Sequence, residues 1–165
     1  MKILYIHGLD SKLSEEKKTI LEKFGTVLAP DLDYYDDSNA IESILGKYEK
    51  EEINMVIGSS MGGFAAYYVS TVLEKPALLF NPALRKRSVE QTIPSVDINS
   101  YTLKYFVIGA QDDVVNPADT LNFISEIYSD FTDFHLHIRP QLAHGIPLNV
   151  FEEEVKNFFN KVLKE

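Results

Sequence analysis

Short apolar runs alternate along this chain with longer segments whose apolar residues recur every three or four positions. The runs are rich in Ile, Leu, Val, Tyr and Phe, and they predict strands at 2–7, 26–30, 53–57, 76–80, 103–109 and 134–138. The longer segments predict helices at about 14–24, 39–51, 61–73, 117–129 and 147–163. Since strands and helices alternate, we expect a doubly wound α/β fold with about six mostly parallel strands and helices on both faces.

The ends of these segments carry signals of their own. Ser14 stands where a helix cap belongs, and Asn116 precedes a proline at the first turn of another helix. The last run, 134–138, alternates polar and apolar residues instead of being apolar throughout. That alternation predicts an edge strand with one wet face, on which His135 and His137 are solvated. A metal site at this pair lacks an obvious third ligand.

Composition narrows the possible functions. With 165 residues, 45% apolar and 25% charged, the chain is expected to form one globular domain, 1–165. Without cysteine it offers no disulfide, thiolate metal site or cysteine nucleophile. A net charge of −9 argues against nucleic-acid binding, and the one basic cluster is Arg85-Lys86-Arg87. The first apolar run is too short for a signal peptide or a membrane span, so we expect a cytoplasmic protein without membrane insertion.

The most informative motif is Gly58-Ser59-Ser60-Met61-Gly62, where a predicted strand meets a predicted helix. A G-x-S-x-G sequence at such a junction is the nucleophile elbow of α/β-hydrolases, a turn so tight that glycine is needed at its flanks. The turn raises the Ser60 hydroxyl above the carboxyl ends of the strands. The alternative is an ordinary Gly-Ser turn in which Ser60 caps the helix. The apolar strand before the motif and the small residues after it favour the elbow.

A serine nucleophile needs a base and an acid, and two loops after predicted strands supply them. His144 lies between the last strand and the last helix, where α/β-hydrolases carry the base. The loop after strand 103–109 contains Asp112 and Asp113, of which Asp112 better fits a G-x-x-D-x-x-V pattern. The predicted catalytic triad is Ser60, Asp112 and His144, with Asp113 as the alternative acid.

Residues after the other strands are expected to complete the site at the carboxyl edge of the sheet, where such sheets bind ligands. The backbone N–H groups of Leu9 and Met61 are the candidate oxyanion donors. His7, Gly8 and Asn81 are the candidate substrate-binding residues. A histidine at the end of the first strand can also orient its loop without touching substrate.

With these residues the chain resembles the α/β-hydrolase superfamily and, within it, the small bacterial YqiA/YcfP-like esterases. The matching pieces are Tyr5-Ile6-His7-Gly8-Leu9-Asp10-Ser11, Gly58 to Phe64, Phe80-Asn81-Pro82-Ala83-Leu84-Arg85, the Asp112 loop and His144. The resemblance implies a serine carboxylesterase or thioesterase that uses no cofactor. Only about 22 residues separate Asn81 from Leu103, too few for a sizeable lid, so we expect an open site for small or accessible acyl groups.

The leading prediction is therefore hydrolysis of a small-molecule ester or thioester through an acyl-enzyme, with no metal and with the oligomeric state left open. A non-catalytic binding or regulatory module on the same scaffold is the alternative, because fold does not fix function. A flavodoxin-like nucleotide domain needs a Gly-rich phosphate loop, whereas the first loop has one glycine and an acid. The cluster at 85–87 has two interpretations: attraction of an anionic acyl-CoA, or a solvated basic turn, which is simpler.

Overall fold

The computed structural model describes residues 1–95, 102–130 and 132–163. Within them one six-stranded sheet has the order β2-β1-β3-β4-β5-β6, and all neighbouring strands are parallel. The strands are β1 (Lys2–Ile6), β2 (Thr26–Leu28), β3 (Met55–Ser59), β4 (Ala77–Phe80), β5 (Lys104–Gly109) and β6 (Phe134–Arg139). The six predicted strands are confirmed, with ends that differ by at most two residues.

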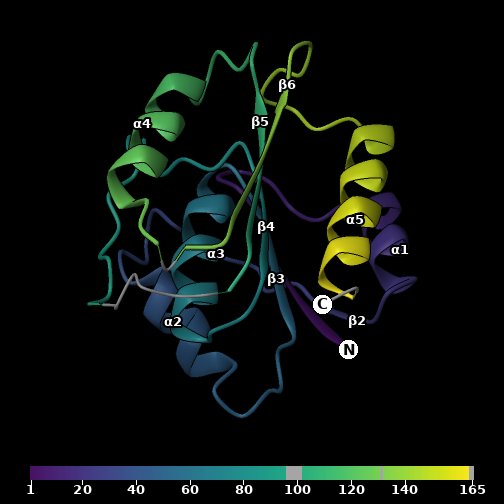
Figure 1. Cartoon of the computed structure of the whole chain (residues 1–165). Helices are drawn as coiled ribbons and strands as arrows, with labels where there is room; N and C mark the ends of the chain where they lie inside the picture. Colours follow the sequence, from purple (N-terminus) through teal and green to yellow (C-terminus); the bar gives the residue numbers. More distant parts are fainter. Residues whose placement is uncertain (96–101, 131, 164–165) are drawn as a thin grey trace.

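Helices cover both faces of the sheet, as the alternating pattern predicts. Figure 1 shows α1 (Glu15–Glu22) and α5 (Leu148–Val162) on one face, and α2 (Ala40–Lys47), α3 (Met61–Val72) and α4 (Pro117–Ile127) on the other. Both predicted caps are confirmed. Ser14 Oγ accepts a hydrogen bond from the Lys17 N–H at 3.3 Å, and Asn116 Oδ1 accepts one from the Ala118 N–H at 2.9 Å.

Among the described residues, two apolar cores hold these layers together, one on each face of the sheet. Leu4 and Val56 belong to the core under α2, α3 and α4. Their strand neighbours Ile3 and Ile57 belong to the core under α1 and α5. Successive residues of a buried strand serve opposite faces, which explains why these strands are apolar at consecutive positions.

The edge strand β6 departs from the prediction in one respect. It does lie at the edge of the sheet, beside β5. However, its exposed face carries Leu136 and Ile138, which are 43% and 47% exposed. His135 packs against a tyrosine ring of β5, and His137 Nδ1 lies 2.8 Å from Glu154 Oε1. Both histidines are therefore partly buried, with the His137 side chain 38% exposed, and they face the fully buried Glu154 side of the sheet where the sequence analysis expected a wet face.

The connection from β4 to β5 leaves the carboxyl edge of the sheet without a large cover in the described part of the chain. Its described residues, 81–95 and 102–103, form neither a helix nor a strand. The rest of this connection, 96–101, lies outside the described residues. Among the helices of the described ranges, none combines the length and the apolar character needed to cross a bilayer.

Candidate active site

The turn between β3 and α3 has the backbone of a nucleophile elbow. Ser60 has a φ of 56° and a ψ of −121°, a conformation that is costly for a residue with a side chain. A Cβ atom added to Gly62 would lie 2.1 Å from the Ile6 carbonyl oxygen, and one added to Gly58 would lie 2.2 Å from the Gly62 carbonyl oxygen. Both glycines are therefore required, because α3 begins in direct contact with β1 and β3.

Backbone hydrogen bonds fix Ser60 at the carboxyl edge of the sheet. Its N–H donates to the Phe80 carbonyl at 2.9 Å, and its carbonyl accepts the Ala83 N–H at 3.1 Å. Pro82 packs so closely on the start of α3 that a Cβ added to Gly63 would approach the Pro82 Cβ to 2.9 Å. The end of β4 thus holds the strained serine in place.

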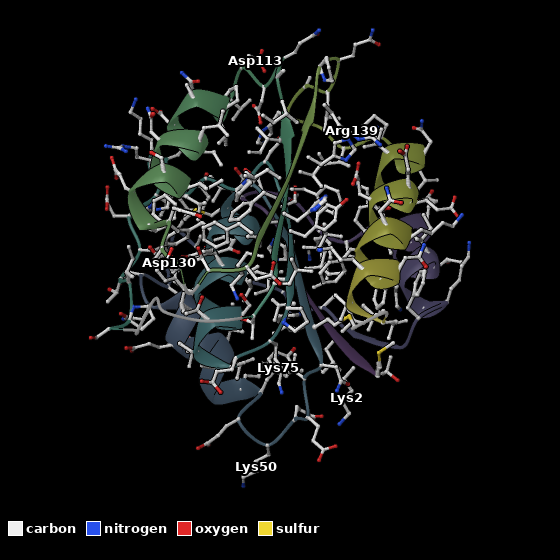
Figure 2. The ribbon with its side chains drawn as sticks, in the orientation of Figure 1. Lys2, Lys50, Lys75, Asp113, Asp130 and Arg139 are labelled. Carbon is white, nitrogen blue, oxygen red and sulfur yellow. The ribbon has the colours of Figure 1, made fainter. Side chains whose placement is uncertain are left out.

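His144 and Asp112 form a hydrogen-bonded pair at this edge. His144 Nδ1 lies 2.8 Å from Oδ2 and 3.0 Å from Oδ1 of Asp112. The Asp112 side chain is 1% exposed, and its Oδ1 also accepts the N–H groups of Val114 and Val115. A carboxylate can only accept, so the neutral imidazole carries its proton on Nδ1 and keeps a lone pair on Nε2. Asp113, the alternative acid, is exposed at the outer tip of the same edge (Figure 2).

Asn81 binds the loop that carries His144. The residue is 2% exposed, and its Nδ2 donates to the carbonyl oxygens of Ala143 at 2.9 Å and His144 at 3.1 Å. Its Oδ1 accepts the Gly109 N–H at 2.7 Å. Backbone groups therefore occupy both atoms of the amide that the sequence analysis expected to contact substrate. The residue before Asn81, Phe80, accepts the Ser60 N–H, so two consecutive residues at the end of β4 bind the backbone of Ser60 and the backbone of the His144 loop.

The loop after β1 lies against the elbow. A Cβ added to Gly8 would lie 3.1 Å from the Ser59 carbonyl oxygen and 3.3 Å from the Ser60 Cβ, so the backbone at Gly8 packs directly on the turn that carries the serine. His7 is 6% exposed, its Nε2 accepts the Leu32 N–H at 2.9 Å, and its Nδ1 donates to the Gly8 carbonyl at 2.7 Å. Both ring nitrogens are bonded to backbone groups, so His7 orients this loop.

A cavity of about 570 Å³ adjoins the same loop, and we call it the Leu9 hollow. It is lined by His7, Leu9, Asp10, Ser11, Lys12, Asp31, Leu32, Asp33, Tyr34 and Tyr35. Lys12 Nζ lies 2.7 Å from Asp31 Oδ2, and the Tyr35 hydroxyl donates to Asp10 Oδ2 at 3.0 Å. This bond to Asp10 raises the pKa of Tyr35. With three carboxylates and one ammonium, the Leu9 hollow carries a net negative charge.

The basic cluster at 85–87 is engaged with the protein itself. Arg85 pairs with Glu126 at 2.6 Å, and Lys86 pairs with Asp119 at 3.0 Å. The Arg87 guanidinium donates to a backbone carbonyl at 2.7 Å and lies 4.1 Å from the centre of a phenylalanine ring. These contacts favour the interpretation of a structural surface turn. Across the described ranges, no three His, Cys, Asp or Glu side chains are grouped so that they could hold a metal ion.

The sequence analysis missed a buried ionic cluster near the site, centred on Glu154 of α5. This carboxylate is fully buried and accepts hydrogen bonds from Arg139 Nε at 2.6 Å and the Tyr105 hydroxyl at 3.1 Å. It also pairs with His137 at 2.8 Å. Burial, and then the charge of Glu154, raises the pKa of Tyr105. In Figure 2, Arg139 extends toward α5. The cluster therefore links β6 to α5, the two elements that the His144 loop connects. A signal was available, because Glu154 follows Phe151 by three positions and falls within an apolar stripe.

Known proteins share this architecture. The profile of an uncharacterised protein family, UPF0227, matches residues 2–116. Est1E from Butyrivibrio proteoclasticus, solved with bound ferulic acid, has a TM-score of 0.72 at 16% identity, over 99% of this chain and 90% of that chain. A Bacillus cereus carboxylesterase has a TM-score of 0.65 at 14% identity, over 97% of this chain and 87% of that chain. A Xanthomonas campestris protein assigned to the alpha/beta hydrolase superfamily has a TM-score of 0.67 at 17% identity, over 97% of each chain.

These matches identify the family and the fold. At such identities the solved structures show the fold alone, whereas the family profile extends over more than half of the chain. The matched region contains the Ser60 elbow, Asn81 and Asp112, and His144 lies beyond it. The chain belongs to the uncharacterised protein family UPF0227, the YqiA/YcfP family, and it has the α/β-hydrolase fold.

Proposed function

We propose that this protein is a serine hydrolase that cleaves carboxylic esters or thioesters through an acyl-enzyme on Ser60. The observation that carries the proposal is the hydrogen-bonded pair of His144 and Asp112 at the sheet edge that also holds the strained Ser60. A strained serine at the same sheet edge as an oriented imidazole is suited to act as a nucleophile. One of the fold neighbours is named a carboxylesterase, which agrees with this reaction class.

Acylation begins with proton transfer. His144 Nε2 takes the proton of the Ser60 hydroxyl while Oγ attacks the carbonyl carbon of the ester. The carbonyl oxygen becomes an oxyanion, to which the N–H groups of Leu9 and Met61 donate. Met61 begins α3, where the N–H groups of the first turn have no acceptor inside the helix. Collapse of the intermediate expels the alcohol or thiol, which takes the proton from Nε2 and leaves the acyl group on Oγ.

Deacylation uses the same residues with water as the nucleophile. His144 Nε2 takes a proton from water as the water oxygen attacks the acyl carbon. The resulting intermediate expels Ser60 Oγ, which recovers its proton from His144, and the carboxylic acid departs. Asp112 stays ionised throughout and stabilises the imidazolium that forms in each half-reaction.

We propose that one side of the ester substrate binds in the Leu9 hollow. This cavity includes Leu9, one of the two proposed oxyanion donors, so a group bound there adjoins the reacting carbonyl. His7 and Gly8 then act on the substrate indirectly, by holding the Leu9 N–H in position. With the short connection after β4, this arrangement suits small or accessible acyl groups.

Covalent labelling tests the proposal directly. A fluorophosphonate probe should label the wild-type protein at Ser60, as mapped by peptide mass spectrometry, and Ser60→Ala should lose both the label and the hydrolysis of 4-nitrophenyl acetate. Ser125→Ala, an exposed serine on α4, is the matched control and should retain both. A folded wild-type protein that takes no label would favour the alternative, a non-catalytic binding module.

A further inference from the structure

Asn81 stands at the carboxyl end of β4 in a conformation that is unusual for a residue with a side chain. Its φ is 41°, and it is 2% exposed. A buried residue in this backbone conformation costs free energy unless its contacts compensate. The compensating contacts are three hydrogen bonds, all between its side-chain amide and backbone groups.

These three bonds join the two loops that carry the proposed acid and base. Gly109, whose N–H binds Asn81 Oδ1, ends β5 three residues before Asp112. Ala143 and His144, whose carbonyl oxygens accept from Asn81 Nδ2, belong to the base loop. One amide therefore fixes the backbone of the base relative to the strand that presents the acid.

The imidazole thus has two independent anchors. Asp112 holds its ring through Nδ1, and Asn81 holds its backbone through the carbonyl oxygen of the same residue. A ring bonded at Nδ1 alone can still pivot about that bond and move Nε2 away from the serine. Fixing the backbone as well removes this freedom, and a shift of about 1 Å at a reacting atom can cost about 100-fold in rate.

We propose that Asn81 is a positioning residue for His144, holding its Nε2 in line with Ser60. This inference rests on the proposed function, because it concerns the same acid–base pair. Asparagine meets both demands of the position. It tolerates a positive φ better than most residues, and its amide supplies an acceptor for Gly109 together with two donors for the loop. Glycine would lack the amide, and aspartate would lack the donors.

A glycine substitution separates the effect of the Asn81 amide from the effect of its backbone conformation. Asn81→Gly preserves the positive φ and removes all three bonds, so we expect kcat to fall about 100-fold while KM stays nearly unchanged. A rise in KM with unchanged kcat would instead indicate a substrate contact and overturn the inference. Asn160→Gly, at an exposed position of α5, is the control and should leave both constants unaltered.

Asn81→Asp gives a pH-dependent readout in a side chain of the same shape. The ionised carboxylate that it introduces would face two carbonyl oxygens without a proton to donate, whereas the protonated form can donate to one of them. The activity of Asn81→Asp relative to the wild type, measured at each pH, should therefore rise as the pH falls. A ratio that does not change with pH would contradict the donor role.

An activity-independent measurement separates failure of this inference from failure of the proposed function. In the wild-type NMR spectrum, the His144 Nδ1–H proton should exchange slowly with water, and Asn81→Gly should accelerate its exchange. If the wild type hydrolyses no ester but shows this change, the hydrolase proposal fails and the anchoring of His144 stands. If the wild type is active and Asn81→Gly leaves both kcat and the exchange rate unaltered, the inference fails alone.

Discussion

His144 Nδ1 lies 2.8 Å from Asp112 Oδ2, although 32 positions separate the two residues along the chain. This bond selects the imidazole tautomer that leaves Nε2 unprotonated, which is the form a general base requires. Two further backbone N–H bonds hold the carboxylate itself, so its orientation does not depend on the histidine. The fixed carboxylate of Asp112 therefore orients the His144 imidazole, and not the reverse.

Removing the charge of Asp112 should disable the base while preserving the fold. In Asp112→Asn the side-chain oxygen can still accept the loop N–H groups, but an amide N–H can face His144 and favour the wrong tautomer. We expect kcat for 4-nitrophenyl acetate to fall by about 10³- to 10⁴-fold. Asp113→Asn, the exposed neighbour, should keep wild-type kcat, and equal losses in the two variants would show that the acid has been misassigned.

The tight packing at the start of α3 predicts that alanine substitutions at two glycines, Gly62 and Gly46, change the free energy of unfolding in opposite directions. A Cβ at Gly62 would collide with the Ile6 and His7 backbone at 2.1 and 2.3 Å, so Gly62→Ala should lower the free energy of unfolding by about 1–3 kcal/mol or more. A Cβ at Gly46 of α2 meets nothing within 4 Å, so Gly46→Ala should raise it by about 0.5–1 kcal/mol. Urea denaturation of both variants checks the pair. A neutral Gly62→Ala would mean that α3 can move away from β1.

Much of the fold could be predicted because its determinants are local. Continuous apolar runs indicated strands covered on both faces, and the sheet confirms this for Ile3 and Ile57 with their neighbours. The elbow was predictable because its G-x-S-x-G pattern lies within five residues, although the contact that requires Gly62 is with the Ile6 and His7 backbone of β1. The pairing of Asp112 with His144 was predictable because each residue follows a strand, and parallel strands bring their carboxyl ends to one edge of the sheet. The assignment of Ser60 to the same triad stays a prediction.

The remaining features depend on contacts that no local pattern encodes. Asn81 meets residues more than 60 positions away, so its partners could not be predicted from its own neighbourhood. Alternation along β6 indicated an edge strand but not which set of side chains would face α5. The side chains of His137 and Arg139 face α5 because both bind Glu154, a carboxylate within the apolar stripe of that helix.

The buried ammonium of Lys104 should make the stability of the protein depend on pH. It begins β5, is 2% exposed, and donates to Thr102 Oγ1 at 2.8 Å. Burial lowers the pKa of its ammonium from 10.5 to about 7. Between these values the unfolded chain binds this proton and the folded chain does not, so stability should rise as the pH increases from about 7 to 10.5. Below pH 7 the buried charge exerts its full destabilising effect.

Replacing the ammonium with an apolar side chain of similar length should remove this dependence. At pH 6 we expect Lys104→Met to be about 2–5 kcal/mol more stable than the wild type, with the difference shrinking as the pH approaches 10. Lys50→Met is the control, because Lys50 is exposed at the amino end of the sheet (Figure 2) and should change stability little at any pH. Chemical denaturation across this range is the measurement. A difference that stays constant with pH would mean that Lys104 keeps its proton in the folded state.

The charge of the Leu9 hollow predicts discrimination between esters. Asp10, Asp31 and Asp33 outnumber Lys12 there, so a negatively charged acyl group should be repelled as it approaches the serine. At low ionic strength we expect kcat/KM for 4-nitrophenyl acetate to exceed that for mono-4-nitrophenyl succinate by about tenfold. Added salt should reduce the ratio, because screening weakens interactions between exposed charges.

Removing negative charges from the Leu9 hollow should reduce this discrimination without lowering kcat/KM for the neutral ester. Asp10→Asn and Asp33→Asn each remove a charge and keep an oxygen for the hydrogen bonds that the carboxylates now accept from Tyr35. The double variant should bring the two kcat/KM values closer together, mainly by improving turnover of the succinate ester. Asp130→Asn, at an exposed residue that does not line the hollow, removes one charge elsewhere and should not change the ratio. If the three substitutions act alike, net charge rather than the Leu9 hollow sets the preference, and the ester binds elsewhere.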